Sequence, residues 1–261
     1  MCEVNYAPVI KDMTWSYSRI TAFEDCPYRW YLKYIRLIED APMFFSDYGS
    51  FVHKIIELSL NGELKKGELV PYYLSNFRKE VKGSAPNRGI FKNYFDQGLQ
   101  YLSRDVLIPY KEILGVEKKL DFKLGDRPFT GVLDCVALDG DAVVILDNKS
   151  RALKKRSSRK TTTKSDEELD QYLRQLYLYS LPTKHVFGKY PDRLEFNCFR
   201  TQELISEPFS KERLEEAIRW ATESVEKIER NEDWSPDMDY WKCKHICGVH
   251  DECEYFQINN S

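Results

Sequence analysis

Hydrophobic positions in the first 110 residues recur with the spacing of α-helices rather than strands. Phe51, Ile55, Ile56 and Leu58 lie on one face of a helix that follows Gly49. Further helices are expected from Ser18 as N-cap through Asp25, over 28–36 with Pro27 in the first turn, from Pro71 onward, and over 90–106. Residues 1–110 are therefore predicted to be a helical N-terminal part.

Near Lys111 the pattern changes to the two-residue period of β-strands. Alternation over 116–122 predicts one strand, and β-rich runs over 129–138 and 142–149 predict two more. The dipeptide Asp139-Gly140 between the last two runs is typical of a tight hairpin. The apolar run 143–146 is continuous rather than alternating, so we expect this strand to be covered on both faces.

The remaining pattern predicts a helix over 166–181 ended by Pro182, a strand over 194–199 and a long amphipathic helix over 211–230. The order of helices, three strands, helix, strand and helix predicts a mixed α/β core. No internal repeat or long linker interrupts it. We expect one domain over 1–261, with a helical part (1–110), an α/β core (111–205), and a C-terminal helix and cysteine-rich segment (206–261).

Composition agrees with a folded protein, since 42% of the residues are hydrophobic and 31% are charged. No apolar run approaches the roughly 20 residues of a membrane span. The first residues lack a basic region followed by a hydrophobic one, so a cytoplasmic protein is expected. In that reducing compartment the seven cysteines are expected to bind metal or to be buried, rather than to form disulfides.

The net charge of −3 hides one concentrated basic segment. Residues 149–164 hold eight lysines or arginines and no acidic residue. Such a run is often a solvated loop, but it also suits contacts with phosphates. Its candidate DNA-binding residues are Arg151, Lys154, Lys155 and Arg156.

Three charged residues lie in or beside the most hydrophobic strands. Asp147 and Lys149 are two residues apart and share a strand face, and Asp134 lies in the preceding strand. One interpretation is a buried ion pair of Lys149 with either aspartate. The other is a site for Mg²⁺ or Mn²⁺, because paired carboxylates are hard oxygen ligands. Glu117 is either a third carboxylate of this site or a surface charge on an alternating strand.

Gly131-Val-Leu-Asp134 followed by Ile145-Leu-Asp147-Asn-Lys149-Ser150 resembles the PD-(D/E)XK nuclease superfamily. Two further segments are similar to its RecB-like branch: Gly49-Ser-Phe-Val-His53, and Gln175-Leu-Tyr-Leu-Tyr179. The N-terminal runs Ser16-Tyr-Ser-Arg-Ile-Thr-Ala-Phe23 and Cys26-Pro27-Tyr-Arg-Trp30 also fit that branch. The resemblance implies the mixed central sheet of the PD-(D/E)XK core.

The resemblance also implies roles for individual residues. Asp134 and Asp147 correspond to the metal-binding carboxylates, Lys149 to the catalytic lysine and His53 to an additional metal ligand. Gln175 and Tyr179 correspond to the pair that positions the lysine or the DNA backbone, and Glu117 to an acidic position of the family. Without the resemblance, His53 reads as a core or surface histidine, and Gln175 with Tyr179 as an ordinary helix pair.

Cys243, Cys247 and Cys253 lie within eleven residues, with His245 and His250 among them, which by itself indicates zinc. The AddB-type and CRISPR-adaptation nucleases that the chain resembles hold a [4Fe-4S] cluster with one N-terminal and three C-terminal cysteines. Cys26 occupies the place of the first. The spacing here is Cys-x3-Cys-x5-Cys instead of the family's Cys-x2-Cys-x5-Cys, which leaves zinc open.

The leading hypothesis is a metal-dependent deoxyribonuclease, an exonuclease preferring single-stranded ends, that uses a metal-activated water. The alternative is a non-catalytic DNA-binding or assembly subunit on a nuclease fold, within a CRISPR-adaptation or recombination complex. A nuclease component of such a machine is a third possibility, and the chain contains no P-loop of its own. Trp15, Tyr17, Trp30 and Tyr31 are either core residues or stacking partners for DNA bases.

Overall fold

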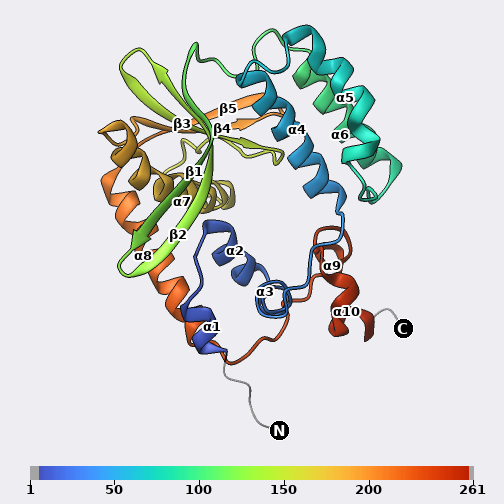
Figure 1. Cartoon of the computed structure of the whole chain (residues 1–261), viewed down its shortest axis with the longest axis vertical. Coiled ribbons are helices and arrows are strands. Elements are labelled where there is room, and N and C mark those ends of the chain that lie inside the picture. Colours follow the sequence, from blue (N-terminus) through green and yellow to red (C-terminus); the bar gives the residue numbers. More distant parts are fainter. Residues whose placement is uncertain (1–5, 259–261) are drawn as a thin grey trace.

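The computed structural model describes residues 6–258. Helices precede a twisted sheet in the chain, and helices and a short cysteine-rich segment follow it (Figure 1). The N-terminal helices are α1 (Ala7–Lys11), α2 (Tyr17–Asp25), α3 (Pro27–Tyr34), α4 (Phe44–Leu60), α5 (Lys66–Glu80) and α6 (Arg88–Leu102). The later helices are α7 (Lys164–Phe187), α8 (Lys211–Glu229), α9 (Tyr240–His245) and α10 (Glu254–Ile258), with a 3₁₀ turn at His250–Glu252.

The five strands form one mixed sheet in the order β1-β2-β3-β4-β5. They are β1 (Glu112–Leu124), β2 (Arg127–Asp139), β3 (Ala142–Lys149), β4 (Arg193–Cys198) and β5 (Glu203–Pro208). Only β3 and β4 are parallel neighbours, and α7 makes the connection between them. The predicted α/β fold class with its N-terminal helices is confirmed. The Asp139-Gly140 hairpin is confirmed too, with Gly140 at a φ of 60° that favours glycine.

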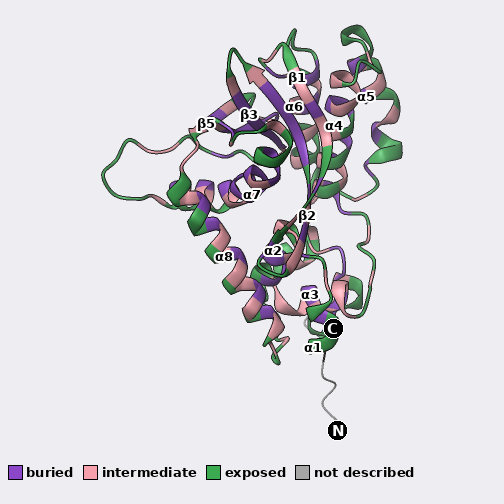
Figure 2. Cartoon of the chain, turned by 60° about the vertical axis from the view of Figure 1, so that its left-hand side comes forward, coloured by how far each residue is buried: buried purple, intermediate pink, exposed green. Residues whose placement is uncertain are grey.

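Strand β3 is covered on both faces, as its unbroken apolar run predicts. Val143 and Ile145 belong to the main core with α7 and α8, whereas Leu146 packs with Ile108 on the opposite face. Full burial of each such side chain contributes about 1.5–3 kcal/mol. Figure 2 shows buried positions concentrated on the central strands and on the inward faces of the helices.

The N-terminal helices split between two places. Helices α1 and α2 pack on α8, and α2 also packs on α3, whereas α4 packs on β1 and carries α5 and α6 with it. The α4–α6 group has its own aromatic core, built around Tyr48, Phe51, Tyr73 and Phe77. Figure 1 shows α4–α6 on one side of the sheet and α7 with α8 on the other. Helix α4 therefore makes the main contact of this group with the sheet, through β1.

Several sequence-based boundaries were wrong. Ser16, not Ser18, caps α2, since its hydroxyl accepts the Arg19 N–H at 3.1 Å. Helix α5 begins at Lys66, with Pro71 inside it. Helix α7 continues past Pro182 to Gly188, whose φ of 79° ends it.

Strand β5 was not predicted. Its six residues include two glutamates, Glu203 and Glu207, and end in Pro208. These residue types are uncommon in strands, so the sequence signal is weak. It forms because β4 offers an unpaired edge, to which β5 adds as an antiparallel neighbour.

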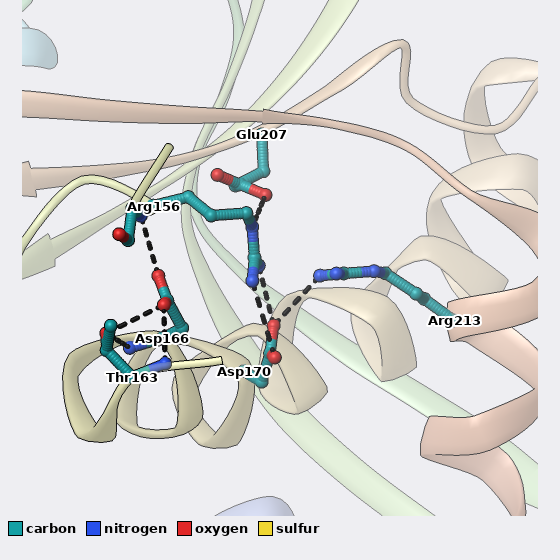
Figure 3. Close-up of polar contacts among 7 residues, drawn as sticks. Arg156, Thr163, Asp166, Asp170, Glu207 and Arg213 are labelled. Carbon is teal, nitrogen blue, oxygen red and sulfur yellow. Dashed lines mark hydrogen bonds and ion pairs between the residues drawn. The ribbon is translucent and has the colours of Figure 1, made fainter. Parts of the chain in front are cut away.

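The connection between β3 and α7 is fixed at its base by a polar network (Figure 3). In the first turn of α7, the Asp166 carboxylate accepts hydrogen bonds from Ser157 N at 2.7 Å and Thr163 N at 2.8 Å. The Thr163 hydroxyl donates to the same carboxylate at 2.7 Å. These bonds lower the pKa of Asp166 to about 2, and the bond from the Ser157 amide has the largest effect. They fold residues 157–163 into a closed loop.

A second part of this network ties the loop to the protein body. Arg156 donates to Asp170 of α7 at 2.6 Å and to Glu207 of β5 at 2.8 Å. Arg213 of α8 donates to the same Asp170 oxygen, Oδ1, at 2.8 Å (Figure 3). Residues 158–162 consequently project from an anchored base.

We predict that Asp166→Ala opens this loop. Trypsin should then cut after Arg159 or Lys160 several times faster than in the wild type, because the amides of Ser157 and Thr163 lose their acceptor. Glu167→Ala is the matched control, since Glu167 is exposed and its side chain makes no hydrogen bond in residues 6–258. Equal cleavage rates for the two variants would show that Asp166 does not close the loop.

Candidate active site

Two carboxylates meet where the pairing of β2 with β3 ends. The last pair is Cys135 with Leu146, and the next residues are Asp134 and Asp147. Asp134 Oδ2 accepts a hydrogen bond from Asn148 N at 2.7 Å. The Asp147 side chain is 4% exposed. The two hydrophobic strands therefore bring a pair of buried carboxylates to one end of the sheet.

Glu117 adds a third carboxylate from β1. It stands opposite Asp134, because its two neighbours in β1 pair with the two neighbours of Asp134 in β2. Its φ of 46° lies in the left-handed region, which is rare for residues other than glycine and costs about 1–3 kcal/mol. The side chain is half-buried rather than on an open strand face. Of the two interpretations of Glu117, the geometry favours the carboxylate of a site.

His53 of α4 approaches the same carboxylates from the opposite side. Its Nδ1 lies 3.3 Å from Asp134 Oδ2. Ligand atoms of His53, Glu117 and Asp134 all lie within 4.8 Å of one another. Asp147 lies next to Asp134 across the strand pair, but its oxygens are outside this group of three ligand residues. The structure thus brings together three elements, α4, β1 and β2, around one point.

Lys149 is held next to this group by polar contacts. Its Nζ lies 2.7 Å from Asp147 Oδ2 and donates to Gln175 Oε1 of α7 at 3.0 Å. Gln175 Nε2 in turn donates to the Tyr179 hydroxyl at 3.4 Å. The lysine side chain is 18% exposed, so its ammonium is both paired and reachable. The predicted Gln175 and Tyr179 pair therefore does contact the lysine side of the site.

Gly131 allows this arrangement. A Cβ at this position would lie 2.3 Å from the Tyr179 ring. Any larger residue would push α7 away from β2 and would take Gln175 away from Lys149. Close packing against Tyr179 therefore explains why a glycine begins the Gly131-Val-Leu-Asp134 segment.

The carboxylates have strongly altered protonation. Burial raises the pKa of Glu117 to about 7, and the nearby Asp134, Glu57 and Asp147 charges add to the effect. Burial, followed by the charge of Asp147, raises the pKa of Asp134 to about 6. Burial disfavours the Lys149 ammonium, but its ion pair with Asp147 outweighs this and raises the pKa of Lys149. Without a cation, full ionisation of both Glu117 and Asp134 is therefore disfavoured.

These residues fit a divalent cation. The donor set of carboxylate oxygens and one imidazole suits Mg²⁺ or Mn²⁺. Asp147 Oδ2 is buried, and within residues 6–258 it forms an ion pair with the Lys149 ammonium, 2.7 Å away. That lysine balances one carboxylate charge, and the ligand atoms of Glu117 and Asp134 remain close together in a half-buried place. A cation would lower the cost of ionising these two carboxylates, whose pKa values are raised by burial and by neighbouring negative charge.

The centre opens into a cleft of about 470 Å³. His53, Lys54, Glu57 and Glu117 line one part of it, and Phe45, Ser46, Gly49, Ser50 and Ser150 line the rest. Arg200, which the sequence analysis did not single out, donates from Nη1 to the Ser150 carbonyl at 3.2 Å and from Nε to Gln97 at 2.8 Å. It thereby fixes the residue that follows Lys149.

A buried amide pair supports the strand ends from the other face. Asn197 Nδ2 of β4 donates to Asn148 Oδ1 at 2.8 Å and to the Tyr101 hydroxyl at 2.6 Å. Sequence analysis missed both asparagines and Arg200. The available signal was the asparagine inside the apolar strand 194–199, because a buried amide needs partners.

The predicted cysteines from the two chain ends lie near one another. Burial raises the pKa of Cys243, Cys247 and Cys253, that of Cys247 to about 11, and the proximity of Cys26 raises each of them further. Cys26 caps α3, and its Sγ accepts the Arg29 N–H at 3.4 Å. The C-terminal thiols pack beside α3 with Leu32 and Val249.

Arg29 lies beside these thiols and favours a negatively charged group, such as thiolates bound to a metal, at this place. Its Nε is buried without a hydrogen-bond partner in residues 6–258, and its charge lowers the pKa of Cys247. Four thiolates around a metal or cluster would supply the missing negative charge. His250 is engaged elsewhere, with Nδ1 2.7 Å from the Cys247 carbonyl and Nε2 3.3 Å from Asp251. His245 packs on Trp241 with ring centroids 5.3 Å apart.

The basic segment divides in two. Lys154 and Lys155 are exposed, and Arg151 is exposed although it pairs with Glu168. Arg156, by contrast, has its charge matched internally by Asp170 and Glu207. The geometry therefore makes Arg156 an anchor of the loop rather than a free phosphate contact.

Of the aromatic residues considered for base stacking, Trp15 and Trp30 are fully buried core residues. Tyr17 and Tyr31 are half-buried, and Tyr17 donates to the Gln171 carbonyl at 2.9 Å.

Comparison with known proteins agrees with this geometry. A family model of the PD-(D/E)XK nuclease superfamily matches residues 14–254. A crystal structure from Eubacterium rectale, described as that of a candidate exonuclease, is similar with a TM-score of 0.54 and 15% identity, over 98% of this chain and 91% of that one. At this identity the likeness concerns the fold alone.

The crystal structure of SSO0001 has 16% identity and a TM-score of 0.33, over 79% of this chain and 95% of that one. No curated protein matches the sequence. None of the helices in residues 6–258 has the length and apolarity needed to cross a bilayer.

The raised carboxylate pKa values predict a pH-dependent response to metal. Because Glu117 and Asp134 bind protons more tightly in the folded protein than in the unfolded chain, the metal-free protein should lose stability as pH rises from about 5 to 8. Mn²⁺ should then raise the melting temperature more at pH 8 than at pH 5.5, since it no longer competes with protons.

Thermal unfolding with and without Mn²⁺ across this range measures the effect. Glu117→Gln should flatten the pH dependence, because it removes the group whose pKa is about 7. A stabilisation by Mn²⁺ that is the same at both pH values, in the wild type, would contradict a site made of these carboxylates.

Proposed function

This chain belongs to the PD-(D/E)XK nuclease superfamily, and from that membership we propose a metal-dependent deoxyribonuclease, an exonuclease that acts on single-stranded ends. One observation carries the proposal. Ligand atoms of His53, Glu117 and Asp134 converge within 4.8 Å, beside a lysine that is held by Asp147 and Gln175. Binding alone requires no such combination.

The roles follow from the contacts. His53, Glu117 and Asp134, with Asp147 next to Asp134 across the strand pair, would hold a divalent cation. Such a cation, when bound, supplies a water of lowered pKa and neutralises charge on the scissile phosphate. The Lys149 ammonium donates hydrogen bonds to phosphate oxygens and stabilises them as their negative charge increases. Gln175 orients that ammonium, and Tyr179 orients the Gln175 amide.

The size of the cleft is compatible with a single strand. Its volume of about 470 Å³ is that of a site for a small ligand, and a single nucleotide is a ligand of this size. The Eubacterium rectale protein of similar fold is described as a candidate exonuclease, which is compatible with action at ends. Arg151, Lys154 and Lys155 lie after the Lys149 strand and bind phosphates of the strand outside the cleft.

We further propose that Cys26, Cys243, Cys247 and Cys253 hold a [4Fe-4S] cluster. Its role is structural, because it joins α3 to the C-terminal segment. The four neighbouring thiols and the unpaired Arg29 donor support an anionic cluster, and a zinc ion is the alternative occupant. Reduced thiols fit a cytoplasmic protein.

Lys149→Ala and Asp134→Ala should each lower the degradation of end-labelled single-stranded DNA with Mn²⁺ by about a hundredfold or more. Lys123→Ala is the matched control, since Lys123 is an exposed β1 lysine outside the cleft. Circular single-stranded DNA should resist the wild type if cleavage starts at ends. Folded, metal-loaded wild type that binds DNA without degrading it would overturn the nuclease and leave the non-catalytic subunit.

Protein purified without oxygen should be brown, with broad absorption near 400 nm, as iron–sulfur clusters with cysteine ligands are. It should contain about four iron and four sulfide per chain. Cys243→Ser should remove the colour, and Cys135→Ala, in the sheet, should keep it. A colourless protein with one zinc per chain would show that the cysteines hold zinc and not an iron–sulfur cluster.

A further inference from the structure

The cysteine-rich segment meets the rim of the active-site cleft. Phe45, which lines the cleft, lies at the start of α4. Its ring centroid is 5.8 Å from that of Trp241 in α9. Figure 1 shows α9 beside this end of α4, far from α9 in the sequence. A residue of the C-terminal segment therefore extends the cleft wall.

A series of contacts leads from the residue that follows Lys149 to this tryptophan. Arg200 donates to the carbonyl of Ser150, the residue after Lys149, and its guanidinium lies 3.4 Å from the centre of the Tyr94 ring. Tyr94 contacts Phe45 edge to face, with centroids 5.2 Å apart. Phe45 then contacts Trp241. The exposed end of the series is thus physically connected to the site.

Trp241 is unusually open for its size. The indole is 47% exposed, although its contacts with Phe45 and His245 hold it in place. A large apolar ring held on a cleft rim, rather than buried, suits a partner with a flat apolar face.

The charge around Trp241 selects the partner. Lys242 and Lys244 are exposed, and neither ammonium forms an ion pair within residues 6–258. A strand of nucleic acid offers phosphates to such cations and bases to the aromatic ring. A duplex hides the base faces in its stack, so only a single strand can use both.

We infer that Phe45 and Trp241 form a base-stacking platform that receives single-stranded DNA at the mouth of the metal cleft, with Lys242 and Lys244 on its phosphates. The inference rests on the proposed nuclease and names where its substrate enters. Trp241 lies two residues before Cys243 in α9, so a metal held by the cysteines would also hold this helix in place. The platform is a binding surface and does not touch the reacting phosphate.

Affinity for a fluorescein-labelled oligodeoxythymidylate of about ten nucleotides tests this, with Ca²⁺ in place of Mn²⁺ to suppress cleavage. Trp241→Ala should weaken binding about 5- to 100-fold, as expected for one lost stacked base, and Trp241→Phe should keep most of the affinity. Blunt duplex of the same length should bind both proteins equally. Tyr190→Ala is the matched aromatic control, since Tyr190 stacks on Phe209 outside the cleft.

A Lys242→Ala, Lys244→Ala double variant should lower the salt dependence of single-strand binding by about one to two ion equivalents. Unchanged single-strand affinity in Trp241→Ala, or an equal loss for duplex, would overturn the platform even if the wild type degrades DNA. Binding that depends on Trp241 in a wild type that never cleaves would overturn only the nuclease. Circular dichroism of each variant separates these outcomes from misfolding.

Discussion

The burial of charge at the end of a hydrophobic sheet is the constraint on which the rest of this structure depends. Asp134 and Asp147 lie within two of the most apolar strands, where the pairing of β2 with β3 ends and water cannot solvate them fully. The protein matches part of this charge itself, with Lys149 against Asp147 and the Asn148 amide against Asp134. It leaves the remainder unmatched, and Glu117 increases the excess. Stability is given up at this point in exchange for a place where a cation binds.

The elements around the sheet have their positions because they serve this centre. Helix α4 must lie against β1 for His53 to reach Asp134, and its aromatic partners in α5 and α6 keep it there. Helix α7 must lie close to β2 for Gln175 to reach Lys149, which Gly131 permits. The strained backbone of Glu117 is tolerated because pairing on both sides of it fixes the strand.

The two ends of the chain form a second centre with a different chemistry. Here soft thiols, rather than carboxylates, gather beside α3, next to the half-buried Arg29, whose buried Nε has no hydrogen-bond partner within residues 6–258. This centre also sets the place of α9, whose Trp241 contacts Phe45 on the cleft rim. The packing of the C-terminal segment and the rim of the cleft are thereby linked through one short helix.

The sequence by itself determined strands β1 to β4, the hairpin at Gly140 and the charged residues at the site, because these follow from local periodicity and turn chemistry. It also placed His53, Gln175 and the four cysteines through segments that resemble a family. Only the tertiary structure decided that Glu117 turns toward Asp134, that Arg156 is neutralised by Asp170 and Glu207, and that β5 adds to an open edge. It alone placed Trp241 at the cleft. Each of these depends on contacts between residues distant in the chain, which no local pattern records.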